Sequence, residues 1–188
     1  MPIEVAKWQS IGPEPPSAGL GSNCPTCGES ASIELGGGSS SKSYHPNLDI
    51  QRLPEVEYVI DFEKDPLPFH DGHAQRIKGI HFIEHISNAA ARKILRECFR
   101  ILVPGGSLFF LVSDAEFVID RLKEDGICEE WLNCIYHAAY PTADGFHKWT
   151  YSFNTLKTEL EAAGFIGVEH RGYYNRWEFY IEAYKDGH

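Results

Sequence analysis

The stretch Ala31-Ser32-Ile33-Glu34-Leu35-Gly36-Gly37-Gly38 gives the strongest indication of the fold. A short apolar run leads directly into a glycine triplet, which is the pattern of a buried parallel strand that ends in a tight turn. Glycine has no Cβ atom, so the backbone reaches positive φ values and a ligand can lie close against it. A bare turn would show the same triplet, and the interpretation therefore depends on the residues that follow.

Two aspartates come next, each at the end of a predicted strand. We predict strands over residues 47–50 and 57–62, with Asp49 and Asp61 near their carboxyl ends. Parallel strands end at a common edge of the sheet, where a carboxylate such as Asp49 is placed to accept hydrogen bonds from both hydroxyls of a ribose. Aspartate is also a frequent strand-end turn residue. The glycine turn and the two aspartates in succession favour a ligand site more than any one of them does.

The rest of the chain alternates strands and helices. Ser87 is a good N-cap for a helix through Leu102, which Val103-Pro104-Gly105-Gly106 would stop. The other predicted elements are strands over 76–82 and 108–112, helical segments over about 115–137 and 153–163, and a hairpin over 167–184. This order predicts an α/β fold, a Rossmann-like three-layer sandwich with a mostly parallel sheet and a C-terminal antiparallel hairpin. Its ligand site is expected at the carboxyl ends of the strands.

Composition limits the domain organisation and the partners. Residues 1–30 contain five prolines and no periodicity, so we expect an irregular or partly disordered segment before one domain over 31–188. The net charge of −10 leaves no basic stripe for a phosphate backbone, and nucleic acid is not an expected partner. No apolar run of membrane-spanning length and no signal peptide is visible, which predicts no membrane partner and a cytoplasmic location. Cys24 and Cys27 form a CxxC, but nothing completes a four-ligand set, so no metal site is predicted.

In order and spacing, these features resemble the class I S-adenosylmethionine (SAM)-dependent methyltransferases. The resemblance is strongest to the methyltransferase type 11 branch and its short relatives linked to polysaccharide biosynthesis. It covers about residues 31–184 and rests on Ile33–Gly38, Asp49, Asp61–Gly72, His81–Ile86, Leu102–Leu108, Phe146–Ser152 and Gly164-Phe165.

The resemblance implies SAM as cofactor and assigns it a set of residues. Gly36 and Gly38 would border its methionine portion, Asp49 would bind its ribose, and Asp61 with the Phe62 backbone would meet its adenine. His81 would lie at the pocket floor. The full set of cofactor-binding candidates is Glu34, Gly36, Gly37, Gly38, Asp49, Asp61, Phe62 and His81.

Methyl transfer from a sulfonium is an in-line displacement that depends mainly on holding donor and acceptor in line. If the acceptor is a hydroxyl, a positioned histidine can remove its proton. His81 is the first candidate and His147 the second, although both also suit an ordinary hydrogen-bonded wall histidine. Glu84 and His85 are expected to cap and pack the following turn. The expected acceptor is a small molecule or a saccharide, with an aromatic wall or ordinary core packing as the two interpretations of Tyr136, Tyr140, Trp149 and Tyr151.

Two departures from the family pattern keep other functions open. Ten residues separate Gly38 from Asp49, too few for the usual helix after the first strand, and Ser40 replaces a third glycine. A non-catalytic SAM- or nucleotide-binding module of the same fold is therefore the alternative. A nicotinamide-dependent oxidoreductase is disfavoured, because Gly36, Gly38 and Ser41 break the GxGxxG spacing. The acceptor atom and the oligomeric state stay open.

Overall fold

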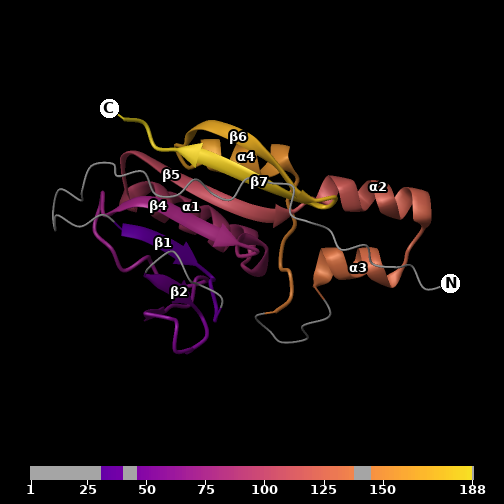
Figure 1. The fold of residues 1–188 in the computed structure, drawn as a ribbon, viewed down its shortest axis with the longest axis horizontal. Helices are drawn as coiled ribbons and strands as arrows, with labels where there is room; N and C mark the ends of the chain where they lie inside the picture. The colour runs from indigo at the N-terminus through magenta and orange to yellow at the C-terminus, as the bar shows by residue number, and fades with distance from the viewer. Residues whose placement is uncertain (1–30, 40–45, 138–144, 188) are drawn as a thin grey trace.

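The sheet has the strand order β3-β2-β1-β4-β5-β7-β6 (Figure 1). The structure is a computed structural model that describes residues 31–39, 46–137 and 145–187. Strands β1 to β5 run parallel, whereas β7 is antiparallel to both β5 and β6. The predicted α/β fold, with a mostly parallel sheet and a C-terminal antiparallel hairpin, is confirmed. The strands are β1 (Ala31–Leu35), β2 (Asn47–Asp49), β3 (Tyr58–Val59), β4 (Ala74–Ile80), β5 (Leu102–Ser113), β6 (Ile166–Asn175) and β7 (Glu178–Tyr184).

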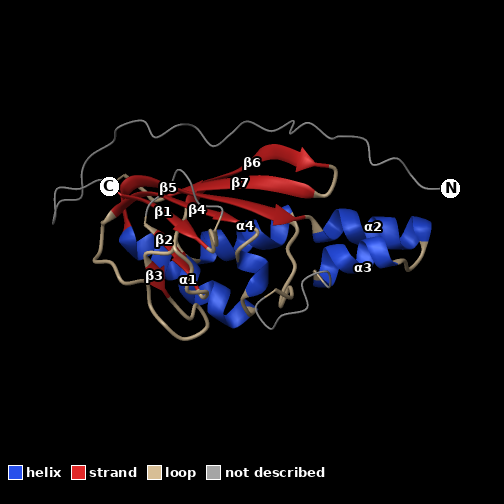
Figure 2. Cartoon of the chain, turned by 60° about the horizontal axis from the view of Figure 1, so that its bottom comes forward, coloured by secondary structure: helices blue, strands red, loops and turns tan. Residues whose placement is uncertain are grey.

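Helices α1 and α4 lie side by side against one face of the sheet (Figure 2). Ser87 caps α1 as predicted, because its side chain accepts a hydrogen bond from the Ala90 N–H at 3.2 Å. The apolar stripe of α1, with Ile94 and Leu95, is buried in the core. The helices are η1 (Ile83–His85), α1 (Asn88–Ile101), α2 (Ala115–Asp125), α3 (Glu129–Tyr136) and α4 (Phe153–Ala162).

Alternation along β5 assigns its residues to the two faces of the sheet. Leu108, Phe110 and Val112 belong to the main core under α1 and α4, whereas Phe109 and Leu111 pack with Tyr180 in a small second cluster. Of the helices in the described ranges, α1 and α4 form one layer on the sheet, while α2 and α3 extend beyond the strand ends (Figures 1 and 2). The second helical layer of the predicted three-layer sandwich is thus not among the residues that the structure describes.

Several element boundaries differ from the prediction for local reasons. Gly126 has φ +79°, which ends α2 and divides the helical segment predicted over 115–137. The predicted strand over 57–62 shortens to β3, so Asp61 follows the strand in a turn. Strand β5 starts at Leu102, so that residues 103–106 belong to the strand and not to a loop.

Arg176, in the turn between β6 and β7, contacts α3. Its guanidinium lies 5.3 Å from the ring centre of Trp131 and 5.0 Å from that of Trp177, and it forms a 2.8 Å ion pair with Glu130. At exposed sites a cation–π contact contributes about 0.5–1 kcal/mol, so these contacts add to the packing of α3. Helix α3 is thereby held near the carboxyl ends of β4 and β5.

None of the described helices combines the length and the apolar character that a membrane span requires. The predictions for residues 1–30, for Ser40 and for Tyr140 fall outside the described residues.

Candidate functional site

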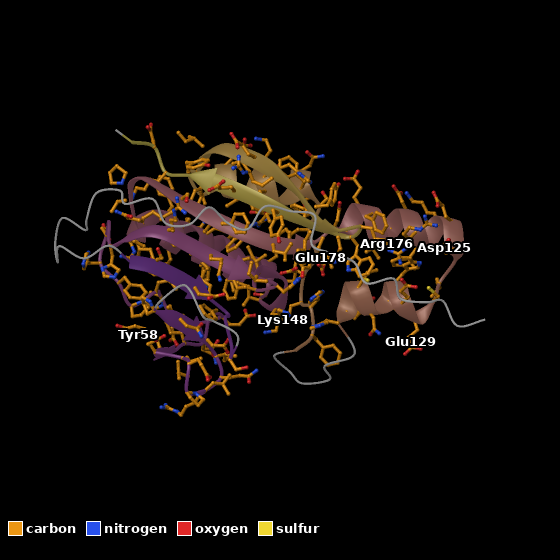
Figure 3. The ribbon with its side chains drawn as sticks, viewed as in Figure 1. Tyr58, Asp125, Glu129, Lys148, Arg176 and Glu178 are labelled. Carbon is orange, nitrogen blue, oxygen red and sulfur yellow. The ribbon has the colours of Figure 1, made fainter. Side chains whose placement is uncertain are left out.

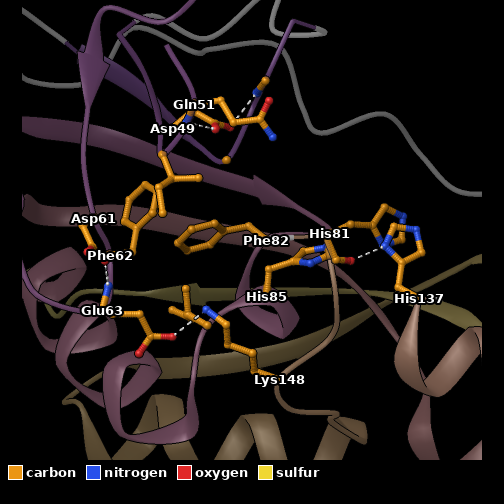
Figure 4. Close-up of a pocket in the computed structure, with 15 residues that line it drawn as sticks. Asp49, Gln51, Asp61, Phe62, Glu63, His81, Phe82, His85, His137 and Lys148 are labelled. Atoms are coloured by element: carbon orange, nitrogen blue, oxygen red, sulfur yellow. Dashed lines mark hydrogen bonds and ion pairs between the residues drawn. The ribbon is translucent and has the colours of Figure 1, made fainter. Parts of the chain in front are cut away.

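A cavity of about 280 Å³ opens at the carboxyl ends of β1, β2 and β4. Six of the eight predicted cofactor-binding residues line it, although they come from four separate segments (Figure 4). Figure 4 shows Asp49 and Gln51 at one end, Phe62 and Phe82 in the middle, and His85 and His137 at the other end. The predicted residues on its wall are Gly36, Gly38, Asp49, Asp61, Phe62 and His81.

The glycine turn after β1 needs glycine at two positions for different reasons. Gly36 has φ +66°, and a Cβ atom there would lie 2.7 Å from Cδ2 of Phe82. Gly38 has φ +52°, and a Cβ atom there would meet no heavy atom of the described residues within 4 Å. Gly36 therefore serves the packing of the turn, whereas Gly38 leaves space beside the backbone that a ligand can fill.

Asp49 joins this turn to the end of β2. Its Oδ2 accepts a hydrogen bond from the Gly38 N–H at 3.0 Å, and its Oδ1 accepts one from the Gln51 N–H at 2.8 Å. A carboxylate offers about four acceptor positions, so about two are left for a ligand. The carboxylate is thus held in a fixed orientation at the cavity wall and retains acceptor capacity for a pair of hydroxyls.

Glu34 and Gly37, which were also predicted to bind the cofactor, are not on this wall. Strand alternation points Glu34 away from the main core, where it forms a 2.9 Å ion pair with Lys78. The Gly37 N–H donates to Asn47 Oδ1 at 3.1 Å. Both residues support the turn from behind and do not face the cavity.

Asp61 and Phe62 follow β3 and form a second part of the wall. The Phe62 ring is buried and packs edge-on against Phe82, with ring centres 4.7 Å apart. Asp61 Oδ1 accepts a hydrogen bond from the Glu63 N–H at 3.0 Å. The hydrogen bond from Lys64 lowers the pKa of Asp61, which therefore carries a negative charge at neutral pH.

Glu63 is a wall residue that sequence analysis did not single out. It accepts hydrogen bonds from the Ser87 N–H at 2.8 Å and the Ser87 Oγ at 2.7 Å, and it forms a 3.0 Å ion pair with Lys148 (Figure 4). Burial raises the pKa of Glu63, but the hydrogen bonds from Ser87 and Lys148 outweigh it and lower the pKa overall. The only sequence signal for Glu63 is its place two residues after Asp61, because Lys148 lies 85 positions away.

His81 follows β4 directly and adopts φ +49°, so the strand cannot continue through it. Its Nδ1 lies 3.8 Å from Glu84 Oε1 and its Nε2 lies 3.5 Å from Glu178 Oε1. Burial lowers the pKa of His81, but the two carboxylates outweigh burial and raise it above its ordinary value of about 6.5. The position predicted for the pocket floor is therefore occupied by a histidine whose cationic form is stabilised.

Glu84, which was expected to cap the following turn, lies fully buried beneath His81. Its Oε1 accepts a hydrogen bond from the Ser113 N–H at 2.9 Å, while its backbone carbonyl accepts one from the Lys148 N–H at 2.7 Å. Burial raises the pKa of Glu84, but its interaction with His81 outweighs this and lowers the pKa. Glu84 thus links the end of β5 and the segment from Gly145 onward to the site.

A second cavity, also about 280 Å³, adjoins His81 on the side of α3. The two predicted catalytic residues, His81 and His147, both line it, whereas only His81 lines the first cavity as well. Glu178 lies at the end of the sheet that faces α3 (Figure 3). The remaining wall residues are Ser113, Asn133, Cys134, His137, Trp177 and Glu178.

The aromatic residue that lines the second cavity differs from those predicted for the acceptor wall. Tyr136 and Trp149 are exposed, Tyr151 is buried, and none of these three lines either cavity. Trp177, from the hairpin, is the aromatic residue on the wall of the second cavity. For Tyr151, the alternative interpretation as core packing is therefore confirmed.

Comparison with known proteins gives a consistent assignment of fold. A family model described as a methyltransferase domain matches residues 40–110. None of the curated proteins compared with the chain matches it in sequence.

Three solved structures illustrate the similarity. A SAM-dependent methyltransferase from Thermotoga maritima, a possible histamine N-methyltransferase, is 17% identical with a TM-score of 0.60, covering 83% of this chain and 82% of that one. A SAM-dependent methyltransferase from Aquifex aeolicus is 17% identical with a TM-score of 0.53, covering 82% and 81%. Human N-acetylserotonin methyltransferase in complex with SAM is 15% identical with a TM-score of 0.50, covering 83% and 47%. This chain shares the fold of these three methyltransferases.

Proposed function

We propose that the chain is a SAM-dependent methyltransferase that holds SAM in the first cavity and the methyl acceptor in the second. The observation that carries the proposal is that Gly36, Gly38, Asp49, Asp61, Phe62 and His81, singled out by motif order, line one cavity. The methyltransferase family model and the methyltransferase fold support the same conclusion.

The first cavity fits the parts of SAM in order. The space beside Gly38 accommodates a chain packed against the backbone, and the remaining acceptor positions of Asp49 suit the two ribose hydroxyls. Asp61 and the Phe62 backbone are then in place for the polar edge of adenine. When bound, SAM supplies a methyl group on a sulfonium, which is ready for in-line displacement.

Of the two predicted catalytic residues, His81 is the better placed to act on the acceptor, because it lines both cavities whereas His147 lines only the second. Its imidazole would take the proton from an acceptor hydroxyl as the methyl group is transferred. Glu84 and Glu178 on either side stabilise the imidazolium that forms. His147, on the wall of the second cavity, would contact the acceptor without touching the first cavity.

The acceptor that we propose is a small molecule or a saccharide with a free hydroxyl. Trp177 offers a flat face for a sugar ring or another apolar group, and Ser113 and Asn133 offer polar groups that can orient it. A saccharide would agree with the resemblance to relatives linked to polysaccharide biosynthesis.

Calorimetric titration of the full chain tests the cofactor assignment. We expect SAM and S-adenosylhomocysteine (SAH) to bind at a single site, and the Asp49→Asn substitution to weaken binding at least tenfold, or about 1.4 kcal/mol. Loss of one charge-assisted hydrogen bond is enough to account for this. Saturable binding of NAD⁺ with no heat from SAM or SAH at millimolar concentration would overturn the proposal.

The short connection between Gly38 and Asp49 keeps a non-catalytic SAM-binding module as the second candidate. Turnover separates the two functions. With SAM and a panel of hydroxylated small molecules and sugars, an enzyme releases SAH in an acceptor-dependent manner, and His81→Gln lowers that rate by about 10²- to 10⁴-fold. A binding module takes up SAM with unchanged affinity in His81→Gln and releases no SAH.

A further inference from the structure

Three histidines from separate segments converge between the two cavities. His85 ends η1, His137 is the C-cap of α3, and His147 lies shortly after the start of the segment at Gly145. One potential ligand atom from each of them lies within 4.8 Å of the other two. The ring centres of His147 are 4.9 Å from His85 and 5.0 Å from His137. The three imidazoles therefore form one cluster.

Backbone carbonyls orient two of the rings. His137 Nδ1 lies 2.9 Å from the Gly145 carbonyl oxygen, and His85 Nδ1 lies 3.3 Å from that of Phe146. A carbonyl can only accept, so Nδ1 is the donor in each of these two contacts. Metal-binding histidines are usually held in this way, with one ring nitrogen donating to a carbonyl or carboxylate.

The third ring has an unsatisfied nitrogen. His147 Nδ1 is buried and has no hydrogen-bond partner among the described residues. A bound cation would satisfy this buried nitrogen, because a ring nitrogen that carries a lone pair can bind a metal ion.

A negative charge lies next to the cluster. The Glu84 carboxylate is fully buried, and its Oε2 has no hydrogen-bond partner in the described part of the chain. Glu84 directly precedes His85 in the chain. A buried carboxylate next to this cluster favours a cation at this position.

We propose that His85, His137 and His147 bind a divalent transition metal ion, for which Zn²⁺ is the best match, in the wall shared by the two cavities. Three histidines with further positions open are a ligand set that zinc uses in catalytic sites. Tetrahedral coordination at about 2.0–2.1 Å places ligand nitrogens about 3.4 Å apart, so the rings need to move together by on the order of 1 Å.

At this position the ion would lie next to both the cofactor and the methyl acceptor of the proposed reaction. His85 and His137 line the first cavity, and His137 and His147 line the second. The sequence did not predict this site, because positions 85, 137 and 147 show no local metal-binding spacing. The proposal concerns metal binding alone and holds or fails independently of methyl transfer.

Metal binding can be measured without cofactor on the tag-free full chain after treatment with EDTA. We expect calorimetry to show one Zn²⁺ bound per chain, and Zn²⁺ to displace bound Co²⁺ with loss of the visible absorption of Co²⁺. Mg²⁺ prefers oxygen ligands and should not bind comparably. His147→Ala and His85→Ala should each weaken Zn²⁺ binding at least 100-fold. His147→Asn changes the side-chain volume less than His147→Ala does and provides a second variant. Circular dichroism checks that each variant is folded.

Two control variants make the test specific. His70 and His73 form an exposed pair, with Nε2 and Nδ1 3.2 Å apart, so the double variant His70→Ala/His73→Ala should bind Zn²⁺ as the unmodified chain does. Cys24→Ser/Cys27→Ser should also leave Zn²⁺ binding unchanged. The proposal is overturned if the unmodified chain binds no Zn²⁺ at micromolar concentration, or if folded His147→Ala and His147→Asn keep the affinity of the unmodified chain.

Discussion

Replacing Gly38 by alanine should weaken cofactor binding far more than it disturbs the fold. Gly38 has φ +52° and Gly72 has φ +65°, and in the described part of the chain a Cβ atom at either position would meet no heavy atom within 4 Å. Both substitutions therefore carry the same backbone penalty of about 1–2 kcal/mol for a left-handed conformation. For a chain of this size, that lowers the melting temperature by about 2–8 °C. Gly38 lines the first cavity, whereas Gly72 does not.

Only Gly38→Ala adds a methyl group where the cofactor would lie. Excess volume in a filled site typically costs about 1–3 kcal/mol, which corresponds to about 5- to 150-fold in affinity. Thermal unfolding without ligand measures the backbone penalty that both variants share. Calorimetry with SAH measures the difference in SAH affinity between them. Equal affinities of Gly38→Ala and Gly72→Ala for SAH would refute the placement of the cofactor against the glycine turn.

Three further predictions test parts of the site and its support. Ser87→Ala removes the N-cap of α1 and a hydrogen bond to Glu63, so we expect a loss of about 1–2 kcal/mol in urea unfolding, and an unchanged midpoint would contradict this role. Lys148→Met removes a partly exposed ion pair with Glu63, which should cost less than about 1 kcal/mol of stability while reducing SAH affinity a few-fold in calorimetry. The hydrogen bond from Arg100 lowers the pKa of Glu97 in the folded chain. The ionised Glu97 carboxylate therefore stabilises the fold fully above its unfolded pKa of about 4.3, and this stabilisation is lost as the pH falls through the folded pKa. The stability difference between the unmodified chain and Glu97→Gln should therefore shrink as the pH is lowered from 5 to about 3, and a difference that does not depend on pH would contradict it.

The sequence predicts those parts of the fold and site that depend on local pattern. Ser87 and the apolar stripe behind it define α1, and an apolar run followed by glycines defines β1 and its turn. Because parallel strands end at one edge of a sheet, three strand-end motifs were sufficient to predict that Gly38, Asp49 and Asp61 lie together.

Features that depend on distant contacts were not predictable in this way. The ion pair between Glu63 and Lys148 spans 85 positions, and no local pattern links the two residues. Glu84 resembled a turn residue in sequence, but packing buries its carboxylate beneath His81. Glu34 shares a motif with the glycine turn, yet strand alternation directs it to Lys78 on the other side of the sheet.

We propose that SAM binds in the cavity beside the glycine turn. A titration of the isotopically labelled chain with SAH, followed by amide chemical shifts in nuclear magnetic resonance, tests both the ligand and the place. We expect saturable shifts concentrated at the amides of Gly36, Gly38, Gln51, Phe62 and Glu63, which line this cavity. No shifts at millimolar SAH, or shifts confined to the second cavity, would contradict it.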